Sequence, residues 1–271
     1  LTLLYSLLDD PSESIRDAAQ KALANYGTEI VEDLFAMLKT DKRRLLESIS
    51  ATFQQIGAET MVPILCDNIG KYDEHLNYWL RRILSSFKRE AHDRVLKLME
   101  NESDEVRRQA ILCMGQIGNE NDAQAVMGHL KDEYWPARIS AAEVLGVLGN
   151  TVCVEALAEV LEDEDEDLAT AAIISLGKLA DERAVPGLIS ALQRESWNLR
   201  FHAVRILGEM HVTRAFIDLI KLLDDDTLDL KNHIIRALAQ IPHIRCLNEL
   251  KTRFVKEPDV DTRIAYIFSN T

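Results

Sequence analysis

The chain has 271 residues, of which 47% are hydrophobic and 28% are charged. This composition indicates a chain that folds throughout, and it excludes a disordered or collagen-like protein. Acidic residues outnumber basic ones by 45 to 31, and the formal net charge of −14 disfavours binding to nucleic acid or to an anionic membrane surface.

The cysteines and the hydropathy pattern indicate a soluble protein in a reducing compartment. Cys66, Cys113, Cys153 and Cys246 stand far apart, and none has the paired spacing of a zinc site or a redox dithiol. We therefore expect four reduced core residues of a cytoplasmic protein. No run of about 18 apolar residues predicts a membrane span, and no basic-then-apolar segment predicts a secretory leader.

A motif returns every 30 or 31 residues along the chain. Its clearest copies read VRRQAILCMGQIG from Val106, ARISAAEVLGVLG from Ala137, LATAAIISLGKLA from Leu168 and LRFHAVRILGEM from Leu199. The residue that opens each copy is called the anchor here, and the anchors are Ile15, Leu45, Leu76, Val106, Ala137, Leu168, Leu199, Leu230 and Val260. A fixed period of this length is typical of stacked units that bury their apolar faces against their neighbours.

Each copy predicts a pair of helices. Apolar residues recur four, eight and eleven positions after the anchor, as Ala110, Met114 and Ile117 do after Val106, and this spacing traces one stripe of a helix. The segments between the stripes show the same periodicity, so every unit is expected to contain two antiparallel helices of about 12 or 13 residues. Gly27, Gly57, Gly118 and Gly149 follow the stripes directly, where a left-handed residue is expected to end the helix.

The repeat runs unbroken across residues 1–271, so we expect one repeat domain without an internal boundary. The chain opens at Leu1 rather than at a methionine, and the copy at Val260 stops short of a complete unit. We therefore expect this domain to be part of a longer protein.

A helix pair with an Asp-Pro turn followed by V-R-x-x-A-x-x-x-L-G-x-L-G resembles a HEAT repeat. The short period and the phrase DERAVPGLISAL from Asp181 resemble the subclass first named for phycobiliprotein lyases. The resemblance covers essentially the whole chain. It implies an all-α fold, a right-handed α-solenoid of about nine stacked antiparallel helix pairs.

The resemblance also implies a ladder between the turn aspartate and the arginine after the anchor. The matching pairs are Asp10 with Arg16, Asn101 with Arg107, Asp132 with Arg138 and Asp225 with Lys231. The second and third units depart from this pattern, with Thr40 and Leu46, then Lys71 and Asn77, at those positions. Irregular stacking is therefore expected between about residues 40 and 90.

By the same resemblance, the anchor-bearing helices line the concave side, where positions two and six after the anchor point away from the core. A candidate partner-binding groove then consists of Tyr78, Arg82, Arg108, Leu112, Ile139, Ile174, Phe201, Arg205 and Arg236. Apolar residues with a basic edge favour an acidic, amphipathic peptide or helix as partner. The alternative is that curvature packs these residues against the adjacent unit.

Other candidate residues have simpler explanations. Trp135 and Trp197 occupy equivalent positions and are either interface anchors or turn-packing residues. His202 and His233 should stand about 10 Å apart, too far for one metal without further ligands. The acidic run Glu162–Asp167 is expected to be a solvated turn. No nucleophile motif or Gly-rich phosphate loop occurs, so we predict no catalytic, cofactor-binding or metal residues.

Three functions remain open. The first is a non-catalytic scaffold whose concave face binds a peptide, helix or domain of another protein. The second, implied by the resemblance, is a bilin lyase or lyase subunit, in which Arg82 and Arg205 would pair with propionates and Tyr78, Trp79 or Phe201 would stack on an open-chain tetrapyrrole. The third, a nucleic-acid repair solenoid, is disfavoured by the charge.

Overall fold

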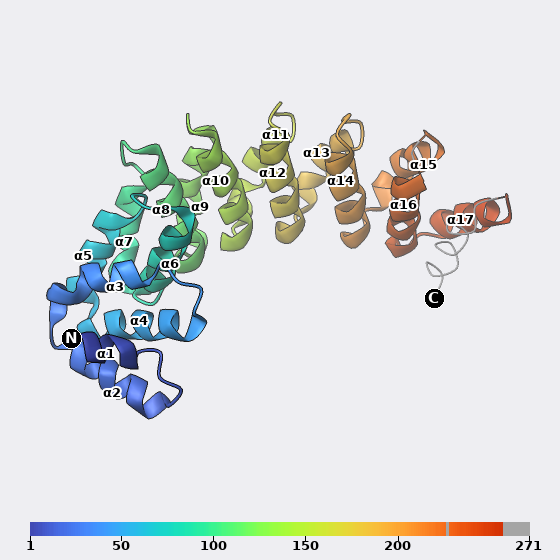
Figure 1. Ribbon diagram of the computed structural model, residues 1–271. Helices are drawn as coiled ribbons and strands as arrows, with labels where there is room; N and C mark the ends of the chain where they lie inside the picture. Colours follow the sequence, from blue (N-terminus) through green and yellow to red (C-terminus); the bar gives the residue numbers. More distant parts are fainter. Residues whose placement is uncertain (226–227, 257–271) are drawn as a thin grey trace. The chain divides into compact units, whose positions relative to one another are not determined.

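The computed structural model describes residues 1–225 and 228–256, and in this part of the chain the secondary structure is helical throughout (Figure 1). The contacts divide the chain into two compact units. The first comprises Leu1–Val126 and Asp132–Val144, and the second comprises Met127–Lys131 and the chain from Leu145 onward. The single domain expected over residues 1–271 stays a prediction, and each unit is described by itself.

The first unit is built from two kinds of helix (Figure 1). Its anchor helices, so named because they carry the anchors, are α2 (Glu13–Ala24), α4 (Arg43–Ile56), α6 (Glu74–Ser85) and α8 (Asp104–Ile117). Its second helices are α1 (Thr2–Leu7), α3 (Val31–Met37), α5 (Ala58–Asn68), α7 (Lys88–Leu98) and α9 (Ala123–Met127), whose last residue belongs to the other unit. The anchor helices α2 and α4, and α6 and α8, lie side by side, so each repeat covers the next.

The second unit continues the same order. Its anchor helices are α12 (Glu166–Leu179), α14 (Trp197–Glu209) and α16 (Leu228–Gln240), and α14 packs against both of the others. Its second helices are α11 (Val154–Val160), α13 (Val185–Ala191), α15 (Phe216–Asp225) and α17 (Ile244–Lys256). The anchor helix α10 (Trp135–Leu148) passes from the first unit into the second. The predicted helix pairs are thus confirmed, but the predicted length of about 12 or 13 residues is wrong for several second helices, since α11 and α13 have 7 residues each. The ninth anchor, Val260, lies outside the described residues.

The anchors form the core where the register is regular. Leu76, Ala137, Leu168, Leu199 and Leu230 are all buried. Two anchors differ. In the second repeat Leu46 is buried and Leu45 is half-buried, although Ile49 and Phe53, four and eight residues after the anchor Leu45, are buried as expected. Ile15 is 41% exposed, because the short helix α1 leaves this face of α2 open.

Glycine at the ninth position after the anchor lets consecutive anchor helices approach closely. A Cβ atom on Gly146 would lie 2.8 Å from Cα of Ser175, and one on Gly208 would lie 2.7 Å from Cα of Ala237. Gly115 and Gly177 face Val144 and Ile206 in the same way. In all four pairs the partner stands seven residues after the next anchor. The repeats therefore stack in one register, set by small residues.

The helix ends are partly as predicted. Gly27, Gly57 and Gly149 have positive φ angles and leave the anchor helices in the expected manner. The prediction is wrong for Gly118, whose φ is −72°, because the chain there runs extended into the Asn119 cap of the next short helix. At the end of α12 the left-handed position is taken by Ala180.

The predicted ladder exists, in altered form. Arg107 binds the carboxylate of Asp132 in the next repeat through hydrogen bonds of 2.9 and 2.7 Å. Arg16 and Arg138 instead donate to the main-chain carbonyls of Asp10 and Asp132, six residues before each. The side chain of Asp225 lies outside the described part of the structure, so its predicted pairing with Lys231 stays a prediction. Each of these arginines therefore bonds to the turn before its own helix, and Arg107 also links two repeats.

In the second and third repeats, where the ladder residues are missing, other side chains replace them. The Asn77 side chain donates to the carbonyl of Tyr72 at 2.8 Å and accepts from the amide of Gly70 at 2.9 Å. Lys42 pairs with Asp9 across the first repeat boundary at 3.0 Å. The anchor helices α4 and α6 contact one another much less than α2 contacts α4 or α6 contacts α8, so the irregular stacking expected between residues 40 and 90 is confirmed there.

Candidate functional site

The candidate residues of the first unit gather on α6 and α8. Tyr78 is 43% exposed, and the guanidinium of Arg82 lies 5.3 Å from the ring centre of Trp79, within cation–π range. Arg82 also donates to the Tyr78 hydroxyl at 3.4 Å. Tyr78 and Arg82 therefore form one exposed surface with an aromatic and a cationic part.

Arg108 forms ion pairs with two neighbouring carboxylates. It lies 3.0 Å from both Glu74 and Glu105, and Gln109 bonds to the same two side chains. Burial opposes ionisation of Glu74, but hydrogen bonds from Arg108, Arg81 and Gln109 outweigh it and lower the pKa of that carboxyl. This network links α6 to α8, so Arg108 contributes first to packing between repeats.

The apolar candidates are only partly accessible. Leu112 on α8, Ile139 on α10 and Ile174 on α12 are all half-buried. Each of these side chains is therefore partly accessible, as a free groove would require, and partly covered, as packing against the adjacent repeat would require. The predicted binding role of these residues stays a prediction.

In the second unit the candidates surround an aromatic stack on α14. The Trp197 and Phe201 rings are stacked, with centres 5.1 Å apart and an interplanar angle of 7°. His202 and His233 meet Phe201 edge-on, with ring centres 5.1 and 4.6 Å from it. Trp197 remains 41% exposed. This residue thus joins a cluster with Phe201, beyond the turn-packing role considered from the sequence.

Cationic side chains follow the stack along the same face. Arg205 lies one turn after Phe201 and pairs with Glu209 at 2.8 Å, and Arg236 is exposed at the equivalent position of α16. Burial, and then the charge of Arg205, lowers the pKa of His202. The His202 Nδ1 atom and the Asn232 Oδ1 atom are buried and have no hydrogen-bond partner among the described residues. Asn232 stands two residues after the anchor Leu230, where the side chain is expected to point away from the core, so the burial of its Oδ1 atom differs from that expectation.

The acidic run has a structural role. In the acidic run, Asp165 caps α12 by accepting from the amides of Asp167 and Leu168, and Glu162 and Glu166 bond to Ser190 and Ser196. Trp135 is 53% exposed at the start of α10.

Within residues 1–225 and 228–256, no three His, Cys, Asp or Glu side chains are grouped as a metal would require. None of the helices described here has the length and apolar character needed to cross a bilayer.

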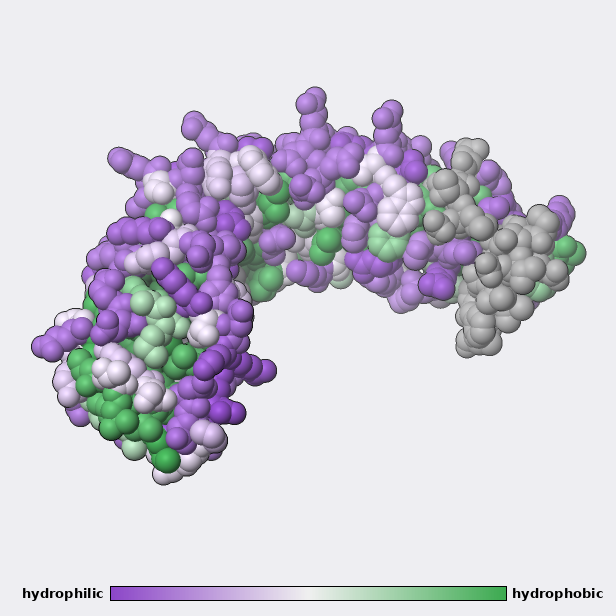
Figure 2. Space-filling model, viewed as in Figure 1, coloured by the Kyte–Doolittle hydropathy of each residue, from purple (hydrophilic) through white to green (hydrophobic). Residues whose placement is uncertain are grey.

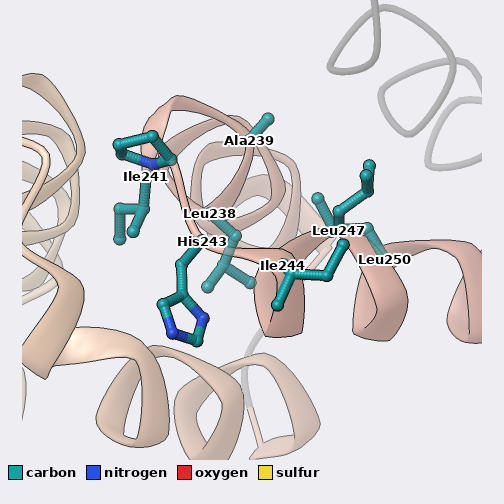
Figure 3. A pocket seen from close by; sticks show the side chains of 8 residues that line it. Leu238, Ala239, Ile241, His243, Ile244, Leu247 and Leu250 are labelled. Carbon is teal, nitrogen blue, oxygen red and sulfur yellow. The ribbon is translucent and has the colours of Figure 1, made fainter.

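A hollow of about 320 Å³ lies where α16 ends and α17 begins (Figure 3). Its lining is mainly apolar and includes Leu238, Ile241, Ile244, Leu247 and Leu250, with His243 beside them. Ala239, also in the lining, stands at the ninth position after its anchor, where earlier repeats meet the following anchor helix. We interpret the hollow as a stacking face of the array.

The surface seen in Figure 2 is mostly hydrophilic. Apolar colour gathers over α1 and α2, where Leu1, Leu3 and Ile15 are exposed. Of these three residues, Ile15 is an anchor, a position that most other repeats bury.

Comparisons with known proteins identify the architecture. The family of HEAT repeats matches residues 71–146, 129–197, 154–239 and 185–269. YibA of Escherichia coli is similar in structure, with a TM-score of 0.59 and 18% identity over 92% of this chain and 95% of YibA. Yeast importin-β (Kap95p), in a structure concerned with its binding to RanGDP, has a TM-score of 0.65 and 13% identity over 99% of this chain and 46% of its own.

The phycocyanin lyase complex of CpcE and CpcF from Nostoc has a TM-score of 0.47 and 18% identity, over 77% of this chain and 92% of that one. No curated protein matches the chain in sequence. The likenesses to YibA and importin-β show the fold, an all-α helical solenoid.

Proposed function

The chain belongs to the HEAT-repeat family, and on this premise we propose that it is a non-catalytic interaction scaffold that binds a protein partner through its anchor helices. The observation that carries the proposal is the exposed aromatic and basic character of these helices, at Tyr78 with Arg82 and at Trp197 with Phe201. Tryptophan, tyrosine and arginine are the residues most enriched in the energetic centres of protein interfaces.

The fold supports this function by analogy. Importin-β shares the helical solenoid, and the description of its structure states that it binds RanGDP. A stack of helix pairs presents one side chain from each repeat at regular intervals, and this arrangement creates a long surface for another protein. The similarity to importin-β does not identify the partner of this chain.

The alternatives have less support. A tetrapyrrole propionate bound to Arg205 would compete with Glu209, which already lies 2.8 Å away. Arg108 is likewise held by Glu74 and Glu105, so a nucleic-acid phosphate would meet two carboxylates there. A protein partner with its own mixture of apolar and charged residues suits such a surface better than a purely anionic ligand.

The test compares anchor helices with second helices in the full chain. The chain is used as bait, the captured protein is purified, and its affinity is measured for Tyr78→Asp and Phe201→Asp. Val152→Asp and Ile217→Asp, at exposed apolar positions outside the anchor helices, are the matched controls. We expect at least a tenfold loss for the first pair, about 1.4 kcal/mol, and no loss for the controls. If only the controls lose affinity while circular dichroism is unchanged, the proposal is wrong.

A further inference from the structure

One face of the second unit combines an aromatic stack with cations at helical spacing. Trp197, Phe201 and Arg205 follow one another at intervals of four residues along α14, so they share a side of the helix. The stacked rings supply a rigid apolar area, and Trp197 is exposed. Such an area is suited to receive one large apolar side chain from a partner.

Charge on this face is distributed unevenly. Lys178, Arg205 and Arg236 occupy the sixth or tenth position after the anchors of α12, α14 and α16, and Glu209 is the acidic residue among them. At the other end of these helices, beside Trp197, Glu166 accepts from Ser196 at 3.0 Å. The face is therefore basic beyond Phe201, although the chain as a whole carries a net charge of −14.

The same face contains unmet hydrogen-bonding capacity. The His202 Nδ1 and Asn232 Oδ1 atoms are buried without a partner among the described residues. Buried polar atoms of this kind are normally hydrogen-bonded. Arg205 follows His202 by three residues on the same helix, and after burial its charge is the second cause that lowers the pKa of His202.

We propose that this face, consisting of Trp197, Phe201, His202, Arg205, Asn232 and Arg236, binds an acidic amphipathic helix. An apolar residue of that helix packs on the Trp197–Phe201 stack, and a carboxylate further along it binds the exposed Arg236, while Arg205 stays paired with Glu209. The inference rests on the proposed scaffold function and assigns the partner's chemistry. Complementary charge selects acidic over basic helices, because a basic helix would bring like charges together.

The experiment uses the full chain and a defined probe. The probe is a fluorescein-labelled synthetic peptide of about fifteen residues, long enough to form a helix, with Leu and Phe on one face and Glu on the other. Its twin has Lys in place of every Glu. Fluorescence anisotropy is recorded at low ionic strength, about 50 mM, where exposed charges are weakly screened.

We expect the acidic peptide to bind and its Lys twin not to bind. Arg236→Glu should weaken binding of the acidic peptide at least tenfold, whereas Lys221→Glu, the same charge change on α15, should not. Phe201→Ala should also weaken it at least tenfold, and Ile217→Ala on α15 should leave it unchanged. Arg236 is exposed, so this variant is expected to fold normally and keeps the test decisive if Phe201→Ala does not fold.

Two results would overturn the inference. One is equal binding of the acidic peptide and its Lys twin, or no binding of either. The other is binding that is insensitive to Arg236→Glu. If a captured natural partner still depends on Tyr78 or Phe201 in that case, the acidic-helix assignment fails and the scaffold function stands. If the acidic peptide binds this face but the natural partner depends on Val152 or Ile217, the scaffold function fails instead.

Discussion

Arg107 on α8 holds the carboxylate of Asp132 in the following repeat with two hydrogen bonds, at 2.9 and 2.7 Å. Both side chains are largely buried, with 15% and 4% of their areas exposed. The same arginine donates to the carbonyl of Asn101 in its own turn at 3.0 Å. One side chain therefore ties a helix to its turn and to the next repeat.

Asp132→Asn should destabilise the chain by about 2 kcal/mol, because the largely buried guanidinium of Arg107 loses one of its two carboxylate partners and keeps only Asp104, at 2.7 Å. Asparagine keeps an oxygen that can accept from the amide of Tyr134, so the turn itself should survive. Urea unfolding followed by circular dichroism measures the change, and Glu133→Gln at the exposed neighbouring position is the control. Equal stability of the two variants would contradict this account of the ladder.

Gly146→Val tests the close approach of α10 and α12. The added Cβ would lie 2.8 Å from the Ser175 main chain, so the helices must separate, at an expected cost of about 3 kcal/mol. Gly128→Val is the control, since nothing lies within 4 Å of its added Cβ. Thermal unfolding compares the two variants. A larger loss at Gly128 would show that the repeat register is not set by these glycines.

His92 is expected to make a pH-dependent contribution to stability. Hydrogen bonds to Asp93 and Asp122, at 3.1 and 3.0 Å, raise its pKa above the ordinary value. A raised folded-state pKa gives stability that is complete below the unfolded-state pKa and is lost as pH rises through the folded-state pKa. His92→Gln should therefore reduce the free energy of unfolding more at about pH 5.5 than at about pH 9. A loss that is equal at both, or larger at the higher pH, would be inconsistent with this role.

The four cysteines should be unreactive in the folded chain. All are buried free thiols, and burial raises the pKa of Cys66 to about 11 and that of Cys113 to about 12. The thiolate is the reactive species, so an aromatic disulfide reagent at about pH 8 should react slowly until denaturant is added. Absorbance of the released thiolate gives the rate. A thiol that reacts rapidly without denaturant would show that its repeat opens locally.

The repeat pattern predicts the helices and most of the core, because burial of Leu76 or Leu168 follows from a stripe repeated within each helix. It does not predict contacts that depend on how repeats stack. The bond between Arg108 and Glu74 joins residues 34 apart, and its existence depends on helix spacing and rotamers. The Trp197–Phe201 stack was accessible from the sequence, since the two rings are four residues apart on one predicted helix.

The predicted positions for partner binding illustrate the same limit. Phe201 and Arg205 share a helix face, and periodicity alone places them together. The partial burial of Leu112 and Ile139 depends on neighbouring repeats, so a pattern within one helix could not separate groove from packing.

Hydrogen exchange of the full chain, alone and with the captured partner, tests the central claim most directly. The account predicts slower amide exchange in the anchor helices α6, α8, α12, α14 and α16 when the partner is bound, with α5, α7, α13 and α15 unchanged. Protection confined to the second helices would contradict binding through the anchor helices.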